Sequence, residues 1–344
     1  MNTFDTLKLL TVVNGVAGDE QSAAAIALEL LKEYTHDIHI DKHGSVIGRL
    51  NSGGVRDNGK PTLLIDAHID EVGLIVTYID DAGFVKAEPC GGADRRMLPG
   101  QSVTIHGKQP VKGVICSPVP HVKTDKESTL KADEIYIDTG YNKQEVSELV
   151  ELSSRVVVNG ELTQLLGDKV CSRALDDRAG VAAILYALSL LKNTNTNFNI
   201  TVVFSVQEEV GCRGARVSAY NADADYAIAV DVSYGASPGC KEYKCGKLSS
   251  GPMIGIAPSL NREMSDGLIK TAQEWEIPYQ LEIMNRDTGG TNADVISLVK
   301  GGVKTALVSI PLKYMHMPVE TASIADIEAA GQLIAAFIEG YEPI

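Results

Sequence analysis

Apolar positions alternate between helical spacing and continuous strand-like runs in two parts of the chain, before residue 70 and after residue 165. Helical spacing covers residues 3–13, 20–34, 178–193, 215–222, 267–277, 291–300 and 322–341. Strand-like runs cover residues 39–51, 61–68, 200–206, 225–233, 279–285 and 303–311. Strands that are apolar throughout and alternate with helices predict an α/β fold, with a mostly parallel sheet covered by helices on both faces.

The intervening stretch, from Val72 to about Asp168, has a different pattern. Short alternating runs, separated by Gly, Pro and Asp, occupy residues 73–79, 83–89, 101–107, 111–117, 134–140 and 154–160. A single brief helical candidate lies near residues 142–151. This pattern is typical of a small β-barrel or sandwich. We therefore predict an α/β domain made of residues 1–70 and 165–344, interrupted by a β-rich insertion at residues 71–164.

Length and composition indicate a soluble globular protein with more than one folded unit, at 344 residues, 44% hydrophobic and 22% charged. The formal net charge of −14, without any basic stripe, argues against nucleic acid as a partner. The N-terminus lacks the basic and apolar regions of a signal peptide, and apolar stretches such as residues 181–188 are too short to span a bilayer. We expect a cytoplasmic protein that has no membrane partner.

Acidic and histidine residues gather where the predicted α/β strands end. In open α/β sheets, sites form at the carboxyl edge of the strands. The residues at such positions are His68, Asp70, Asp176, Asp177, Glu208, Glu209, Asp231 and His316. Two of them, Asp176 and Asp177, come just before a helix, and the others end or follow a strand. The sequence thus predicts a crevice that combines two histidines with several carboxylates.

This cluster needs compensating positive charge, because buried carboxylates repel one another and raise each other's pKa. Arg173 and Arg178 are too few to neutralise it. Imidazole and carboxylate together suit zinc, cobalt or manganese, and six ligand positions overfill a single tetrahedral site. The pattern therefore predicts a two-metal centre with one bridging carboxylate.

Each residue also has a simpler interpretation when it is taken alone. An aspartate before a helix, such as Asp176 or Asp177, is commonly an N-cap. The adjacent Glu208 and Glu209 would ordinarily be a solvated surface pair, and His316 a partly buried histidine in a Met-rich loop. Agreement among five strand ends, rather than any single residue, favours the metal centre.

Six segments, in order along nearly the whole chain, resemble the M42 family of metallo-aminopeptidases. They are AHIDEVG (67–73), RALDDRAG (173–180), VQEEVGCRGA (206–215), AVDVS (229–233), DTGGTNAD (287–294) and YMHMPVE (314–320). This family includes glutamyl, lysyl and tetrahedral aminopeptidases, and some members are labelled endoglucanase M. The β-rich insertion falls where the family carries a PDZ-like dimerisation domain.

The resemblance implies that five residues hold two divalent ions: His68 and Asp231 the first, Glu209 and His316 the second, and Asp176 both. Glu208 would be the general base, and Asp70 would orient the imidazole of His68. Asp66 and Glu71 receive no role. The implied activity is the removal of N-terminal residues from short peptides, with zinc as the expected metal and cobalt or manganese as alternatives.

The resemblance also bears on substrate binding and assembly. Gly289 and Gly290, beside Thr291, would let the backbone approach the substrate closely. His121, in the insertion, could reach the site of a neighbouring subunit. The insertion would join subunits into dimers and then into a tetrahedral dodecamer, whose enclosed lumen would admit short peptides.

The chain departs from the family pattern at positions that are not implied metal ligands. Asn292 stands where the family often has Asp, and Lys313 and Met317 stand where it often has Arg and Ser. These differences concern substrate preference and pocket shape rather than the reaction.

Other functions would use parts of the same pattern. A glycoside hydrolase of the endoglucanase type uses paired carboxylates, but it leaves His68 and His316 without a use and calls for aromatic sugar platforms. Aromatic residues make up only 5% of the chain, and Trp275 is its sole tryptophan. A catalytically inactive scaffold or binding protein of the same fold would not need an intact ligand set. A di-zinc deacylase or carboxypeptidase would share the metal core but not the position of the insertion.

Overall fold

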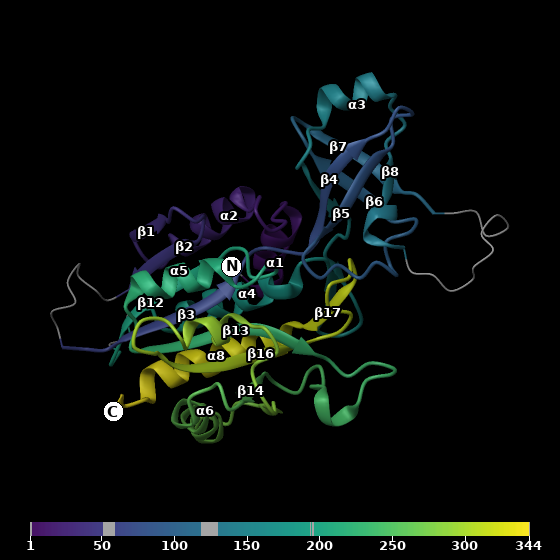
Figure 1. Cartoon of the computed structure of the whole chain (residues 1–344). Helices are drawn as coiled ribbons and strands as arrows, with labels where there is room; N and C mark the ends of the chain where they lie inside the picture. Colours follow the sequence, from purple (N-terminus) through teal and green to yellow (C-terminus); the bar gives the residue numbers. More distant parts are fainter. Residues whose placement is uncertain (1, 51–58, 118–129, 193, 195, 344) are drawn as a thin grey trace.

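The computed structural model describes residues 2–50, 59–117, 130–192, 194 and 196–343. Figure 1 shows an α/β body that contains both ends of the chain and a β-barrel that projects from it. The predicted α/β fold with an inserted barrel is confirmed. Within the described ranges, no helix has both the length and the apolar character needed to cross a membrane.

The body is built on a mixed sheet of eight strands. In spatial order they are β1 (Asp37–Ile40), β2 (Val46–Leu50), β12 (Asn199–Ser205), β3 (Thr62–His68), β13 (Tyr226–Tyr234), β16 (Lys304–Leu312), β14 (Met253–Ile256) and β15 (Gln280–Ile283). The central strands β12, β3, β13 and β16 run parallel, and antiparallel pairs flank them on both sides. The carboxyl ends of the four central strands therefore meet at one edge of the sheet.

Helices cover both faces of this sheet, as predicted. One face is packed by α1 (Thr3–Val12), α2 (Gln21–Leu31), α4 (Leu175–Leu190), α6 (Arg262–Glu274) and α8 (Ile324–Gly340), and the other by α5 (Arg213–Ala222) and α7 (Asn292–Ile296). Along β3, Leu63 and Ile65 point into the first core and Leu64 into the second. Because a strand's side chains alternate between two buried faces, every position is apolar until the strand reaches the site.

The insertion is a closed barrel with the strand order β4 (Gly73–Ile79), β5 (Val85–Cys90), β8 (Tyr136–Asp138), β7 (Pro110–Ile115), β6 (Ser102–His106) and β9 (Arg155–Val158). All neighbouring strands are antiparallel, and α3 (Lys143–Leu149) lies at the far end of the barrel (Figure 1). Its interior is filled by apolar residues such as Val85, Ile105, Ile137 and Val156. The division of the chain at residues 71 and 164 stays a prediction.

A second, three-stranded sheet was not predicted. It contains β10 (Thr163–Gln164), β11 (Lys169–Ser172) and β17 (Glu320–Ser323), and β14 of the main sheet was missed as well. These strands have two to four residues, too few for a period to stand out. The pairing of β11 with β17 places Ser172 opposite Glu320. It thereby brings the start of α4 next to the loop that follows β16.

Candidate metal centre

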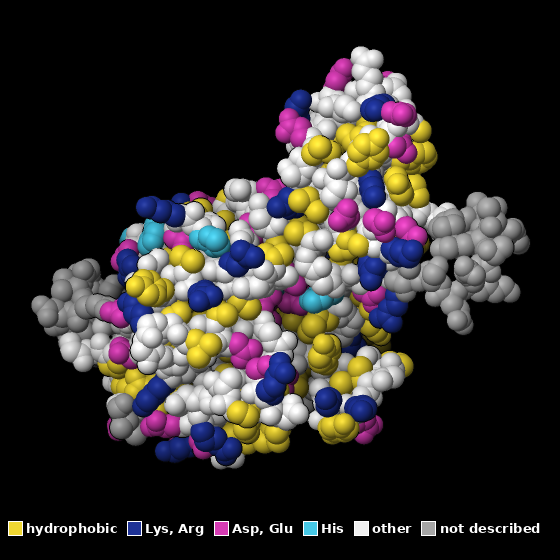
Figure 2. Space-filling view, viewed as in Figure 1, with side chains coloured by type: hydrophobic (Ala, Val, Ile, Leu, Met, Phe, Trp, Pro, Cys, Tyr) yellow, Lys and Arg dark blue, Asp and Glu magenta, His cyan; other side chains and the backbone are white. Residues whose placement is uncertain are grey.

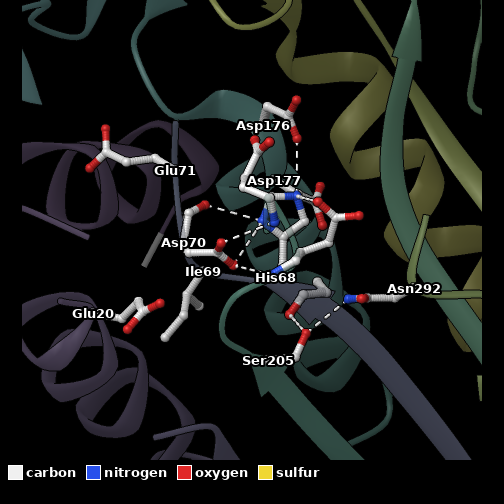
Figure 3. A network of polar contacts seen from close by, with 12 residues as sticks. Glu20, His68, Ile69, Asp70, Glu71, Asp176, Asp177, Ser205 and Asn292 are labelled. Carbon is white, nitrogen blue, oxygen red and sulfur yellow. Dashed lines mark hydrogen bonds and ion pairs between the residues drawn. The ribbon is translucent and has the colours of Figure 1, made fainter. Parts of the chain in front are cut away.

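Buried histidine and acidic side chains cluster at the carboxyl edge of the sheet. The residues predicted there lie together: His68, Asp70, Asp176, Glu208, Glu209, Asp231 and His316. In Figure 3, Asp70 and Asp176 approach the ring of His68 from two directions. Figure 2 shows magenta acidic atoms and a cyan histidine in the hollow below the barrel.

Asp176 lies between the two histidines. Its Oδ1 atom is 3.1 Å from Nε2 of His68, and its Oδ2 atom is 3.4 Å from Nε2 of His316. Each of these nitrogens has a further carboxylate nearby. The Oδ1 atom of Asp231 is 4.0 Å from Nε2 of His68, and the Oε2 atom of Glu209 is 3.4 Å from Nε2 of His316. The geometry thus forms two donor groups that share Asp176, and a third group, of His68, Glu208 and Glu209, overlaps with both.

Both donor groups fit a divalent ion. The ligand atoms of His68, Asp176 and Asp231 lie within 4.8 Å of one another, and so do those of Asp176, Glu209 and His316. Imidazole nitrogen and carboxylate oxygen are the donors that zinc and similar ions take. Within the described residues, the buried Oε1 atom of Glu209 has no hydrogen-bond partner, as expected for an oxygen that an ion would occupy.

The negative charge of the cluster is not balanced by lysine or arginine side chains. In the part of the chain that the structure describes, no Lys or Arg forms an ion pair with a carboxylate of either donor group. Burial raises the pKa of Asp231 well above its usual range, and burial together with the charge of Asp176 does the same for Glu209. For Asp176, burial acts in the same direction, but hydrogen bonds from His316 and His68 hold its pKa well below the usual range.

Asp70 connects His68 to the two glutamates. The Nδ1 atom of His68 lies 3.1 Å from the backbone carbonyl oxygen of Asp70 and 3.5 Å from its carboxylate. The carboxylate accepts hydrogen bonds from the backbone N–H groups of Glu208, at 2.9 Å, and Glu209, at 3.2 Å. Asp70 was predicted to orient the imidazole through its carboxylate. The shorter contact is made by its carbonyl oxygen, while its carboxylate holds the glutamate segment.

His316 is oriented by the barrel side of the site. Its Nδ1 atom lies 3.1 Å from the carbonyl oxygen of Gly92, in the loop after β5. A Cβ atom on Gly92 would lie 2.7 Å from that nitrogen, so only glycine leaves room for the ring. Each histidine therefore has a backbone carbonyl at Nδ1, which leaves Nε2 free to bind a metal.

Non-glycine residues adopt left-handed backbone where the chain enters the site. These residues are Ala174 (φ 56°), Gln207 (φ 58°) and His316 itself (φ 63°). L-residues rarely adopt this conformation, and it persists where the surrounding structure imposes it, commonly at functional sites. The strain lies at or beside the residues whose side chains form the donor groups.

A crevice of about 1040 Å³ opens next to the cluster. Its lining includes Glu208 and His316, and also Gly289, Gly290 and Thr291, the residues predicted to contact substrate. Thr291 also caps α7, because its hydroxyl oxygen accepts a hydrogen bond from the backbone of Ala293. His121, predicted to reach a neighbouring subunit, lies outside the described residues.

A family model described as M42 glutamyl aminopeptidase matches residues 44–333. This chain belongs to the M42 family of metallo-aminopeptidases. It is 36% identical to a putative aminopeptidase of Acetivibrio thermocellus over 97% of this chain and 98% of the relative. The structure of aminopeptidase APDkam598 from Desulfurococcus kamchatkensis superimposes with a TM-score of 0.91, at 32% identity, over 98% of this chain and 95% of that one. Pyrococcus horikoshii TET1 peptidase, described as able to assemble into a tetrahedron or a large octahedral shell, gives a TM-score of 0.87, at 30% identity, over 99% and 100%.

Membership of the M42 family decides between the functions that the sequence left open. The chain is a metallo-aminopeptidase, and the alternatives of a glycoside hydrolase and an inactive scaffold are set aside. The expected resemblance is therefore confirmed, and the fold is that of the M42 aminopeptidases.

The simpler interpretations fail for most of the clustered residues of this M42 enzyme. The side chains of Glu208 and Glu209 are 13% and 5% exposed, so they are not a solvated pair. The N-cap interpretation is right for Asp177, whose Oδ1 atom accepts a hydrogen bond of 3.0 Å from the backbone of Gly180. Its neighbour Asp176 points to the histidines instead.

Glu320 was missed as a residue of the site. Its Oε2 atom accepts a hydrogen bond of 3.1 Å from the backbone N–H of Asp176, and Oε1 accepts one of 2.9 Å from that of His316. The carboxylate is buried and connects the backbone of Asp176, the predicted shared ligand, to that of His316. The four-residue spacing from His316 was visible in the sequence, but the contact with Asp176 depends on the β11–β17 pairing.

Glu71 forms a separate buried ion-pair cluster. It pairs with Arg173 and, at 3.1 Å, with Arg178, whose side chain is fully buried. Burial alone would raise the pKa of Glu71, but the charges of the two arginines lower it below the usual value. The arginines considered as neutralisers of the metal cluster are therefore engaged elsewhere, and Figure 3 shows Glu71 directed away from His68.

Asn292 forms a buried hydrogen-bonded pair with Asp66. The Nδ2 atom of Asn292 donates a hydrogen bond of 2.6 Å to Asp66 Oδ2. It donates another of 2.9 Å to Ser205 Oγ (Figure 3). Asp66 is fully buried, and burial raises its pKa to about 7. The amide of Asn292 supplies the hydrogens for both contacts, which an ionised carboxylate at this position would lack.

Proposed function

We propose that this M42 enzyme removes the N-terminal residue of short peptides by means of two divalent ions and a glutamate base. Five residues would hold the ions: His68 and Asp231 the first, Glu209 and His316 the second, and Asp176 both. The observation that carries this proposal is the position of Asp176, whose two oxygens face different histidines at 3.1 and 3.4 Å.

Glu208 is the proposed general base. Its Oε1 atom accepts a hydrogen bond from the Sγ atom of Cys212 at 3.3 Å, and its Oε2 atom faces the cluster, 4.0 Å from Nε2 of His68. Burial raises its pKa, which suits a group that accepts and then returns a proton near neutral pH. When bound, ions in such a site act as Lewis acids and lower the pKa of water from 15.7 to about 7. Glu208 would take the proton from the attacking water and pass it to the leaving amine.

The donor set bears on the choice of metal. Carboxylates and imidazoles, without cysteine, fit zinc first and leave cobalt and manganese as alternatives. Asp70, Gly92 and Glu320 would hold the ligands in place, since each contacts a predicted ligand residue or its backbone.

We further propose that the barrel joins subunits into dimers and then into a dodecamer. Exposed apolar side chains on the barrel, including Tyr78, Phe84, Val114 and Leu152, support this surface as an interface. Figure 2 shows apolar atoms gathered along one side of the projecting barrel. Enclosure in such an assembly would restrict access to short peptides.

Hydrolysis of aminoacyl-p-nitroanilides, before and after removal of metal, tests the proposed function. We expect hydrolysis of substrates with a free α-amine, its loss on chelation and its return with zinc, cobalt or manganese. An N-acetylated substrate and soluble cellulose serve as controls that should remain intact. Hydrolysis that persists after complete loss of metal, or cleavage of the N-acetylated substrate, would contradict the proposal.

A further inference from the structure

Glu282 occupies the floor of the crevice. It lies on the edge strand β15, and its side chain reaches back over the sheet towards the predicted metal centre. The hydroxyl of Ser233 donates a hydrogen bond to Oε1, and that of Ser309 donates one of 2.7 Å to Oε2. The carboxylate is thus held firmly by two neutral donors.

These serines place Glu282 close to Asp231. Ser309 is the register partner of Asp231 on β16, so the two backbones are about 4.8 Å apart. Ser233 follows Asp231 by two residues on the same face of β13, a separation of about 7 Å. A carboxylate bound to both serines therefore lies about one side-chain length from the predicted ligands.

The charge of Glu282 has no protein partner among the described residues. No Lys, Arg or His nitrogen there lies within ion-pair distance, and the serines carry no charge. Burial raises the pKa of Glu282, which shows that its surroundings disfavour the charged form. A partly buried carboxylate without a cation is costly, unless a ligand brings the cation.

Several methionines line the crevice together with polar residues. Met253, Met284 and Met315 line the same crevice. Methionine side chains adapt to irregular shapes and would pack along an aliphatic stem. A recessed acid in a crevice that also contains methionines matches a side chain with a long hydrocarbon stem and a positive end.

We propose that Glu282 binds the cationic side chain of the substrate's first residue, so that the enzyme prefers N-terminal lysine or arginine. The inference rests on the proposed function, because it assumes that the scissile bond lies at the metal centre. The side chain of the substrate's N-terminal residue then enters the crevice past Asp231, and its charged end reaches Glu282.

A competing charge lies at the rim. Lys244, in the short helix η2 (Glu242–Lys244), lines the same crevice and would favour acidic side chains. It is exposed, however, whereas Glu282 is recessed, and solvent screens an exposed charge far more. The recessed carboxylate should therefore determine the preference for the first residue.

The test compares Lys-, Arg-, Leu- and Glu-p-nitroanilide with the metal-loaded enzyme and its variants. The wild type should favour Lys and Arg over Leu by at least about 10-fold in kcat/KM. Glu282→Gln should lower kcat/KM for Lys by about 10- to 100-fold and leave the value for Leu nearly unchanged. Glu282→Lys should shift preference towards Glu. Glu242→Gln, which removes an exposed carboxylate from the same crevice, is the matched control and should leave the Lys-to-Leu ratio unchanged.

Wild-type hydrolysis of Leu or Glu in preference to Lys and Arg would overturn this inference and leave the proposed function standing. An equal loss on Lys and Leu in Glu282→Gln would also overturn it, because Glu282 would then not discriminate between side chains. Failure of the wild type to hydrolyse any of the substrates would instead overturn the proposed function, and this inference with it.

Discussion

Residues 68–71 take part in two buried charge clusters, one with arginine partners for its carboxylate and one without any lysine or arginine partner. On one side, Glu71 is neutralised by Arg173 and Arg178 and accepts a further hydrogen bond from the backbone of Gly15. On the other side, His68 begins a cluster of carboxylates with which no Lys or Arg of the described chain forms an ion pair. In the first cluster the carboxylate is compensated by arginines, whereas in the second the carboxylates have no such partner.

The comparison separates buried charges that stabilise the fold, such as the Glu71 ion pairs, from buried charges suited to binding metal, such as the carboxylates around His68. A buried ion pair that is satisfied within the protein locks segments together, here the segment after β3 and the start of α4. A buried set of carboxylates without cations is tolerable where other positive charge arrives, and metal ions supply it. Changes to the two clusters should therefore affect different properties.

The largest effect is expected on turnover. Glu208→Gln should keep both ions, because Glu208 is not a predicted ligand, and should lose about 10²- to 10⁴-fold in kcat with its proton acceptor. Glu209→Gln is the matched neighbour and should lose metal as well as activity. Metal analysis and kinetics on both variants would check this. If Glu208→Gln lost metal and Glu209→Gln kept it, the roles of the two residues would be exchanged.

The next largest effect is a loss of stability on disrupting the ion-pair cluster of Glu71, Arg173 and Arg178. Glu71→Gln leaves the fully buried Arg178 without its charged partner and should lower the free energy of unfolding by about 3–5 kcal/mol. Metal bound per folded chain should not change. Urea denaturation would measure the loss, with Glu29→Gln, which breaks an exposed pair with Lys32, as a control expected to cost under about 1 kcal/mol. A Glu71→Gln protein of unchanged stability that bound fewer ions would place Glu71 in the metal centre.

A smaller effect, on metal affinity, is expected from changing Glu320, which contacts the predicted ligand residues but is not itself a predicted ligand. Glu320→Gln weakens the contacts to the backbone of Asp176 and His316 and should reduce metal affinity by about 10- to 100-fold. Competition with a chromophoric chelator would measure it. Glu328→Gln, which alters a hydrogen bond to Thr3 on α1, should leave affinity unchanged. Equal affinities in Glu320→Gln and the wild type would show that Glu320 has no part in positioning the ligands.

The smallest effect is a dependence of stability on pH. Asp326, at the start of α8, accepts hydrogen bonds from the backbones of Ser249 and Gly251 but is buried, and burial raises its pKa from 3.8 to about 6. The folded state then holds the proton more tightly, so this contribution to stability is full below about pH 4 and is lost as pH rises through 6. Between these values, Asp326→Asn should show a shallower decline in the free energy of unfolding than the wild type. Parallel slopes would contradict the assignment.

The sequence predicted the parts of the molecule that depend on long periodic segments. β3 is apolar from Leu63 to Ile65 and β13 from Ala227 to Val230, so both the strands and the polar residues that follow stood out. The barrel was equally recognisable, because its runs alternate between interior and solvent. Both results follow from burial, because the buried positions of a long regular element recur at a fixed spacing in the sequence.

What the sequence could not predict depends on tertiary contacts between short segments. Glu320 reaches Asp176 only because β11 pairs with β17, and neither strand exceeds four residues. The spacing of Asp176 and Asp177 did not distinguish the residue between the histidines from the helix cap, and only the resemblance to the M42 family singled out Asp176. The partners of Glu71 were likewise hidden, since Arg178 lies over a hundred positions away, at a separation of 107.

The most direct test of the central claim is a crystal structure of the zinc-loaded enzyme with anomalous diffraction at the zinc edge. Two peaks per chain are predicted, about 3.5–4 Å apart, one beside His68 and Asp231, the other beside Glu209 and His316, with Asp176 in contact with both. A single fully occupied peak under saturating zinc, or ions bound away from Asp176, would contradict it.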